Sequence, residues 1–228
     1  MLEVLVAIIS LSVASYYDLR YRLIPDEIWV FMGIVGLLLR IFYLDSTISY
    51  LESYLLFLLI LIVLLLMEWI LSSSGEADLL AFASLSVLSS WPPGFLPPPL
   101  STYIYSKILA VLVIPFQALI NIYRVIRRPE LLERFDEPIW RKLLAIILLS
   151  PYSKALSYGA SIAETEIEGR RKFILRAALS PISEVEPPEG KWIAPTYPMV
   201  PFILLGYLIT ICVGDPISLL YQLLRLSP

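Results

Sequence analysis

Histidine is absent from the 228-residue sequence, and cysteine occurs once, at position 212. Without histidine the chain cannot supply the Ser-His-Asp or Cys-His groups of nucleophilic hydrolases, nor an H-E-x-x-H zinc site. A single cysteine excludes an internal disulfide and a four-cysteine zinc site. If the protein is an enzyme, its acid and base groups are therefore expected to be carboxylates, with no metal.

Charge is also scarce, since 16% of the residues are charged and 58% are apolar, whereas soluble domains have roughly 25% and 45–50%. The composition predicts an all-α polytopic membrane protein in contact with the lipid bilayer, with about six transmembrane helices. The largely apolar runs that predict these helices are 1–17, 28–44, 50–71, 79–91, 100–123 and 192–213.

A polar segment, 124–191, separates the last two spans. It contains 12 of the 17 Lys and Arg residues and 10 acidic residues, a mixture that does not indicate a nucleic-acid partner. Together with the first loop it holds 14 of the 17 positive charges on one side, which the positive-inside rule makes cytoplasmic. The expected parts are 1–123 as helices 1–5, 124–191 as a small cytoplasmic domain of mixed structure, and 192–228 as helix 6 with an amphipathic surface tail.

A short polar island, 72–78, lies between two long uncharged runs. Ser73 and Glu76 fit the S-x-x-E pattern of helix starts, and the run that follows, 79–91, is too short to cross a hydrocarbon core of about 30 Å. The fourth helix is therefore expected to begin before Asp78, which places this carboxylate near the apolar layer. An ionisable residue there indicates a functional role. The other interpretation is that Asp78 only complements the positive end of the helix dipole.

A second carboxylate, Asp18, ends the first span. In a six-span topology Asp18 and Asp78 lie on the same side at similar depth, where two carboxylates cannot both ionise cheaply. The protonated one can then act as an acid while the other activates water, which is the chemistry of aspartic proteases. Asp18 can also be an interfacial residue that pairs with Arg20 or Arg22. Other nearby acids leave the choice of pair open, namely Asp26, Glu27, Glu68 and Glu76.

Three stretches carry a resemblance to a known family. Tyr17-Asp18-Leu19-Arg20, followed by Ile24-Pro25-Asp26, resembles the first motif of type IV prepilin peptidases and archaeal preflagellin peptidases. Gly75-Glu76-Ala77-Asp78 resembles their second motif, G-x-G-D. The stretch Pro198-Met199-Val200-Pro201-Phe202, ahead of Gly206 and Gly214-Asp215, resembles the end of these chains.

The resemblance implies a membrane aspartic endopeptidase of the GxGD type, with Asp18 and Asp78 as catalytic residues and Gly75 and Ala77 as motif backbone. Such enzymes remove the short basic leader, a class III signal peptide, from pilin-like and archaellin precursors at the cytoplasmic membrane face. Ala77 departs from the motif, because alanine lacks part of the conformational freedom of glycine.

Acidic residues are candidates for binding the basic leader. They are Glu76 and Asp26, with Glu164, Glu166 and Glu168 in the polar segment. The bacterial members typically carry two Cys-x-x-Cys pairs and also methylate the new N-terminus. This chain lacks those cysteines and a glycine-rich cofactor loop. The resemblance therefore favours the archaeal branch, with no cofactor and no methyl transfer.

Two further classes of function remain open on the sequence. A proton- or cation-coupled transporter would use Asp18 and Asp78 as ion ligands, although no inverted repeat is visible. A non-catalytic membrane scaffold would make both aspartates dispensable. Cleavage of a co-expressed pilin-like precursor separates the peptidase from both alternatives, and the sequence leaves the oligomeric state open.

Overall fold

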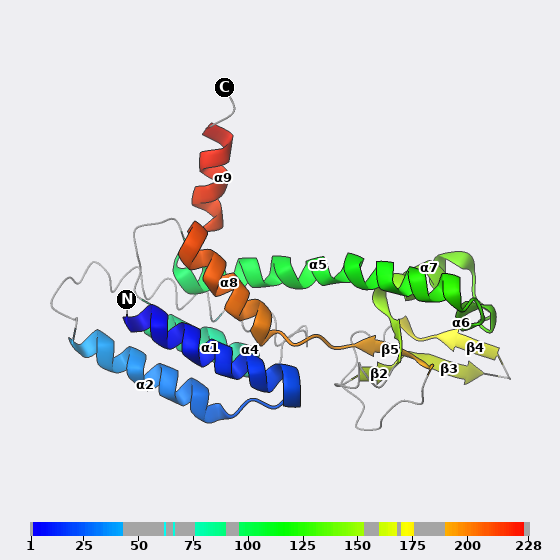
Figure 1. Ribbon diagram of the computed structural model, residues 1–228, viewed down its shortest axis with the longest axis horizontal. Helices are drawn as coiled ribbons and strands as arrows, with labels where there is room; N and C mark the ends of the chain where they lie inside the picture. The colour runs from blue at the N-terminus through cyan, green and yellow to red at the C-terminus, as the bar shows by residue number, and fades with distance from the viewer. Residues whose placement is uncertain are drawn as a thin grey trace. The chain divides into compact units, whose positions relative to one another are not determined.

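The computed structural model describes residues 2–42, 62, 66, 76–89, 96–152, 160–167, 170–175 and 190–225. These residues are mostly helical and belong to two compact units (Figure 1). Unit 1 comprises Met1–Leu109 and Pro198–Pro228, and unit 2 comprises Ala110–Tyr197. Of the expected span 50–71, only Ile62 and Leu66 are described, and both are helical.

Unit 1 is built from helices alone in the described part of the chain. In chain order they are α1 (Leu2–Tyr21), α2 (Asp26–Phe42), α4 (Glu76–Leu88), the first part of α5 (Pro98–Arg127), α8 (Val200–Val213) and α9 (Pro216–Arg225). The start of α4 two residues before Asp78 confirms the expectation that this helix begins ahead of the carboxylate.

The first loop of unit 1 shows why α1 and α2 end and begin where they do. Arg22 has a φ of 56°, in the left-handed region, so the right-handed helix cannot continue through it. Pro25 then precedes α2, and its carbonyl accepts a hydrogen bond from Ile28 N at 3.2 Å. Proline suits a helix start because its missing N–H has no partner to lose there.

The core of unit 1 lies between α1, α2, α4 and α8, each of which contacts at least one of the others (Figure 1). Small and hydroxyl-bearing residues fill many of the buried positions. Examples are Ala7, Ser10, Ala14, Ala81, Ser84 and Ser86. Two of these hydroxyl groups bind carbonyls of their own helix, since Ser84 Oγ donates to Leu80 O at 2.5 Å and Ser86 Oγ to Phe82 O at 2.6 Å. Such side chains let helices approach closely in a bilayer.

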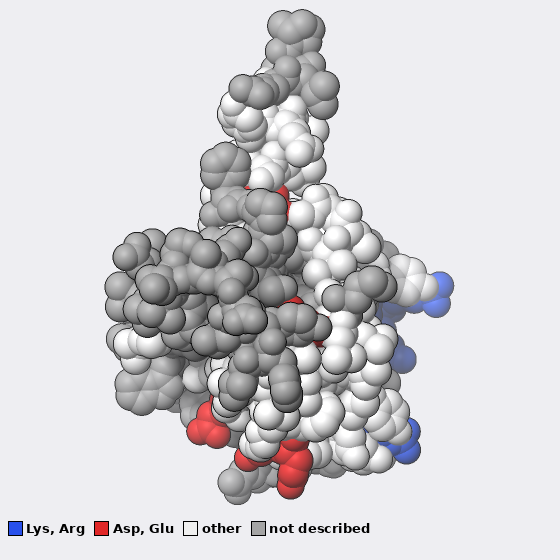
Figure 2. Space-filling model, turned by 90° about the vertical axis from the view of Figure 1, so that its left-hand side faces the viewer, with Lys and Arg blue, Asp and Glu red and all other residues white. Residues whose placement is uncertain are grey.

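Many large apolar side chains of unit 1 also face outward, beside those that are buried in its core. On α1 the exposed ones are Leu2, Leu5, Ile9, Val13 and Tyr16. Most described atoms on the face in Figure 2 belong to uncharged residues; basic side chains appear at its right-hand edge, and acidic ones appear at its lower edge with small patches further in. Two described helices, α1 and α5, are long and apolar enough to cross a membrane, and α8 with α9, bent by 47°, makes a third if the pair is one span. The protein is a membrane protein, as the composition predicts.

The expected sixth span, 192–213, is wrong in its first part. Trp192–Pro195 is a strand, β5, and the helix α8 begins only at Val200. The reason is the proline content, because Pro195 and Pro198 lack N–H donors and restrict the residues before them to extended backbone. Pro201 is compatible with the helix because it lies in the first turn.

Unit 2 contains the second part of α5 and a small mixed α/β region. Its remaining elements are α6 (Glu130–Glu133), α7 (Ile139–Leu148), β1 (Ser150–Pro151), β2 (Ala160–Ile162), β3 (Glu164–Ile167), β4 (Arg170–Phe173) and β5. The strands form an antiparallel sheet of order β1-β5-β2 and an antiparallel pair β3-β4. The expected all-α class is therefore corrected. Strands β1 to β4 lie within 124–191, the segment for which a small mixed domain was expected, and β5 directly follows it.

Aromatic side chains hold the core of unit 2. Phe135 and Phe173 stack with ring centroids 3.9 Å apart, and Trp192 meets the Phe173 ring edge-on. Ala145 and Ile146 on α7 are buried in the same cluster. One side of α7 therefore contributes to the domain core.

Gly36 fixes the distance between α2 and α4. A Cβ atom placed on Gly36 would lie 2.8 Å from the Leu88 Cα, a backbone atom that cannot swing aside. Gly33, one turn earlier on α2, has open space around the same position. The two glycines therefore offer a matched pair for testing how closely α4, the helix of Asp78, must approach α2.

We expect Gly36→Ala to destabilise the protein by about 1–3 kcal/mol, because the added methyl group forces α2 away from α4. Gly33→Ala should be neutral or stabilise by up to about 1 kcal/mol, because alanine favours the helix. Thermal unfolding of both variants in detergent measures the difference. Equal melting temperatures for the two variants would contradict the close packing of α2 on α4.

Candidate active site

Asp18 and Asp78 lie on the core-facing stripes of their helices. On α1, Asp18 continues the buried series Ala7, Leu11 and Ala14, spaced four and three residues apart. On α4, Asp78 opens a buried series that continues at Ala81, Phe82 and Leu85. Residues at these spacings share one face of an α-helix. Both carboxylates are therefore directed inward by the same periodicity that directs the apolar core.

The two carboxylates are almost fully withdrawn from the surface, Asp18 being 8% exposed and Asp78 7%. Helices α1 and α4 contact each other, and both contact α8. Their buried apolar residues belong to one hydrophobic cluster. The structure thus places the two predicted residues on neighbouring helices of a single core, where acidic groups are costly to keep without a role.

Asp18 binds the start of α8, a contact that joins residues far apart in the chain. Its Oδ2 atom accepts a hydrogen bond from the backbone N–H of Val200 at 3.0 Å. The first N–H groups of a helix have no partner inside the helix, and the residue before α8, Met199, supplies no side-chain cap. A carboxylate from α1 therefore satisfies the beginning of α8, where the helix dipole also favours negative charge.

Arg22 approaches the other oxygen of the same carboxylate. Its Nη1 atom lies 3.9 Å from Asp18 Oδ1, near the outer limit of an ion pair. The ion pair between Asp18 and Arg22, one of the two pairings considered from the sequence, is therefore present, but its distance is long. Asp18 is not a simple surface residue, because its short contact is to the backbone of α8.

The motif residues around Asp78 form regular helix. Ala77 lies in the first turn of α4, and among the described residues only Arg22 is a non-glycine residue with positive φ. Position 77 therefore does not use the freedom that glycine would bring, and alanine is the best helix former. Gly75 and Ser73 lie outside the described residues.

The acids considered for leader binding differ in exposure. Glu76 and Asp26 are exposed in the first turns of α4 and α2. Glu166 is exposed on β3, and Glu168 lies outside the described residues. The prediction that Glu164 binds the leader is wrong. This residue is 8% exposed, and its Oε2 accepts a hydrogen bond from Trp192 N at 3.1 Å. It holds β5 in unit 2 and is not available to a leader peptide.

Two groups near Asp18 were not singled out by sequence reasoning. Val200 contributes its backbone N–H, for which the signal is a helix start marked by Pro198 and Pro201. Ser15 lies one turn before Asp18 on the same buried face, and its hydroxyl has no hydrogen-bond partner among the described residues. Its three-residue spacing from Asp18 is the sequence signal for it.

Within the same described part of the chain, no group of three or more His, Cys, Asp or Glu could hold a metal ion.

Residues 5–120 match the model of the type IV leader peptidase family. The matched range contains α1, α2, α4 and most of α5, and therefore both buried aspartates. No curated protein matches the sequence.

We expect Asp18→Ala to lower the melting temperature, because it leaves the buried Val200 N–H without its acceptor, at a cost of about 1–3 kcal/mol. Asp18→Asn should melt close to the wild type, because its side-chain carbonyl can still accept that hydrogen bond. Asp26→Ala, at an exposed position, is the control for loss of a carboxylate. An Asp18→Ala protein as stable as the wild type would show that the contact with α8 contributes nothing.

Proposed function

The chain belongs to the type IV leader peptidase family, and from this premise we propose that it is an aspartic endopeptidase whose catalytic pair is Asp18 and Asp78. The observation that carries the proposal is the pair of buried carboxylates on two contacting helices inside the matched range. A chain without histidine has few other groups for moving protons at a peptide bond.

In the proposed reaction one carboxylate is ionised and the other protonated. The ionised group takes a proton from water as the water oxygen attacks the scissile carbonyl carbon. The protonated group stabilises the developing oxyanion, and a proton is delivered to the leaving nitrogen as the C–N bond breaks. Water is thus divided between the new carboxylate and the new amine, and the pair returns to one shared proton.

The Val200 N–H supports a positioning role for α8 in this scheme. It holds Oδ2 of Asp18 at 3.0 Å, so Oδ1 is the oxygen that we assign to the water or the substrate. Ser15, one turn away with a hydroxyl that lacks a partner in the described region, is a candidate to bind the peptide backbone. Fixing the carboxylate before the substrate arrives lowers the cost of reaching the reactive geometry.

The substrates of this family are precursors of pilin-like proteins, and we propose that this chain removes their short basic leaders, including those of archaellins. Glu76 and Asp26, exposed at the starts of α4 and α2, are the acids proposed to attract the leader. We further propose six spans, with 124–191 and the cut site on the cytoplasmic side. The uneven distribution of Lys and Arg supports this orientation. The missing cysteine pairs favour cleavage without methyl transfer.

Asp18→Asn and Asp78→Asn should each abolish detectable cleavage of a co-expressed pilin-like precursor. An amide cannot exchange a proton at neutral pH, and acid–base participation is worth about 10²- to 10⁴-fold. The size shift of the precursor on a gel, at equal amounts of membrane-inserted enzyme, is the measurement. Glu27→Gln, an exposed acid with no assigned role, should cut like the wild type. Near-normal cleavage by either asparagine variant would contradict the proposal that Asp18 and Asp78 form the catalytic pair, and would favour a transporter or scaffold.

Rising salt should increase the KM for the precursor, because exposed charges are screened with a Debye length of about 10 Å at 0.1 M. The double variant Asp26→Asn/Glu76→Gln should have a higher KM at low salt and a weaker salt dependence, with kcat little changed. Glu130→Gln/Glu133→Gln, which removes two exposed acids from α6, is the matched control. Identical salt dependence in all three proteins would exclude Asp26 and Glu76 as the leader-binding acids.

A further inference from the structure

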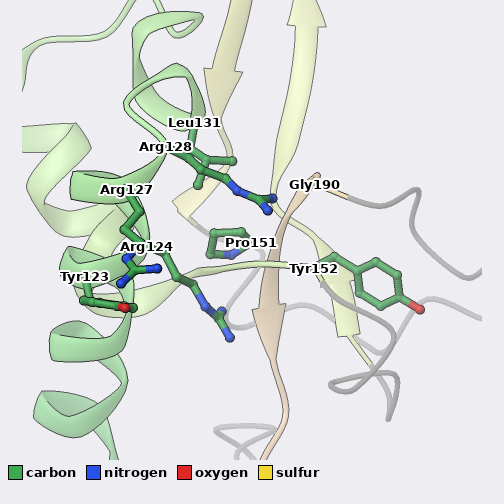
Figure 3. Close-up of a pocket in the computed structure, with 8 residues that line it drawn as sticks. All are labelled: Tyr123, Arg124, Arg127, Arg128, Leu131, Pro151, Tyr152 and Gly190. Carbon is green, nitrogen blue, oxygen red and sulfur yellow. The ribbon is translucent and has the colours of Figure 1, made fainter.

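Three arginines line a pocket in unit 2 that the proposed peptidase reaction does not use. The pocket has a volume of about 510 Å³ and lies at the end of α5 (Figure 3). Its lining residues are Tyr123, Arg124, Arg127, Arg128, Leu131, Pro151, Tyr152 and Gly190. Arg124 and Arg127 lie in the last turn of α5, and Arg128 follows directly after it. In Figure 3 the Arg128 side chain extends toward Gly190, while Arg127 lies over the Tyr123 ring.

A polar network holds Arg124, one of the residues that line the pocket. Arg124 Nη1 donates to Ser150 Oγ at 3.2 Å, and Gln117 Nε2 donates to the same oxygen at 2.9 Å. Asn121, which is fully buried, donates to the carbonyl oxygens of Ile146 and Leu149 at the end of α7. Arg124, on α5, is thus held by a contact with β1. Side chains held in this way are ordered before a ligand binds.

The positive charge of the pocket is not neutralised within the described residues. No described carboxylate forms an ion pair with Arg124, Arg127 or Arg128, although α6 nearby carries the exposed Glu130 and Glu133. Arg127 instead lies with its guanidinium carbon 4.8 Å from the centre of the Tyr123 ring. Three like charges around one cavity repel one another, and an anion relieves that repulsion. Guanidinium groups match the oxygens of phosphate in pairs of parallel hydrogen bonds.

The surroundings of the pocket favour a phosphate carried by a lipid. The arginines end α5, one of the two described helices long and apolar enough to cross a membrane, so they lie where headgroups are expected. The same unit presents an outward apolar stripe on α7, with Ile139 77% exposed, Leu143 54% and Ile147 42%. An amphipathic helix of this kind rests on a bilayer surface with its apolar side inserted.

We propose that the pocket formed by Arg124, Arg127 and Arg128 binds the phosphate group of an anionic membrane lipid and so anchors unit 2 at the membrane surface. The group that the arginines bind is a phosphate monoester or diester, and the expected source is a lipid headgroup. The proposal does not depend on the catalytic pair, because its readout is lipid binding and not cleavage.

The test is native mass spectrometry of the full-length protein in detergent, with equal amounts of phosphatidylglycerol and phosphatidylcholine added. The wild type should retain phosphatidylglycerol selectively. Arg127→Gln/Arg128→Gln should weaken that binding by roughly fivefold for each arginine removed, or about 25-fold in total. The matched control, Arg134→Gln/Lys172→Gln, removes two positive charges outside the pocket and should bind like the wild type. Arg124 is left intact because it contacts Ser150 and its loss would disturb folding.

A further arm adds glycerol 3-phosphate or inorganic phosphate in place of lipid. Weak binding of both, with selective phosphatidylglycerol binding lost only in the pocket variant, supports the lipid site. Tight binding of a soluble phosphate would overturn the assignment to a lipid. Equal losses in the pocket and control variants, or no preference between the two lipids in the wild type, would overturn the proposal. Melting temperatures of the variants are compared first, and a pocket variant that unfolds while binding neither lipid nor phosphate would assign the arginines to folding.

Discussion

The hydrogen bond from the Val200 N–H to Asp18 joins the first helix of the chain to α8, across 182 positions in the sequence. Helix α8 is preceded by Pro198 and carries Pro201 in its first turn, so its opening N–H groups have few partners nearby. In an apolar environment, these N–H groups can form hydrogen bonds only with a group from another element. Asp18 does so, and the placement of α8 beside α1 and α4 then builds the core that holds both aspartates.

A bilayer changes what holds such a core together. Lipid tails are as apolar as leucine, so large apolar residues gain little by turning inward, and close packing of small residues takes over. The inward stripes of α1 and α4 follow this rule, with alanine and serine at many of their buried positions. Gly36 and Gly206 extend it, since a Cβ on either would lie under 3 Å from the backbone of a neighbouring helix. A carboxylate on such a stripe is held in place with little room to move.

The sequence predicts where the helices lie better than it predicts which distant segments contact one another. Helical spacing and the shortness of the run after Asp78 were enough to begin α4 before that residue, and hydropathy was enough to find α1 and α5. Hydropathy failed at Trp192, because an apolar stretch can be a strand when β1 and β2 offer partners. The choice of Glu164 as a leader-binding acid, made from its charge, failed as well, because its carboxylate is buried against the backbone of Trp192, 28 residues later. Both errors concern pairings between distant segments, which a local pattern does not contain.

The positions of the two aspartates along their helices bear on the choice between a peptidase and an ion-coupled transporter. Asp18 lies three residues before the end of α1, and Asp78 is the third residue of α4. Transporters bind their ions near the middle of the membrane, between helices broken at that depth. A peptidase instead needs its acids near helix ends, where water can enter and a substrate backbone can leave its helical hydrogen bonds. Both residues lie within one turn of a helix end, a position that suits the proposed peptidase.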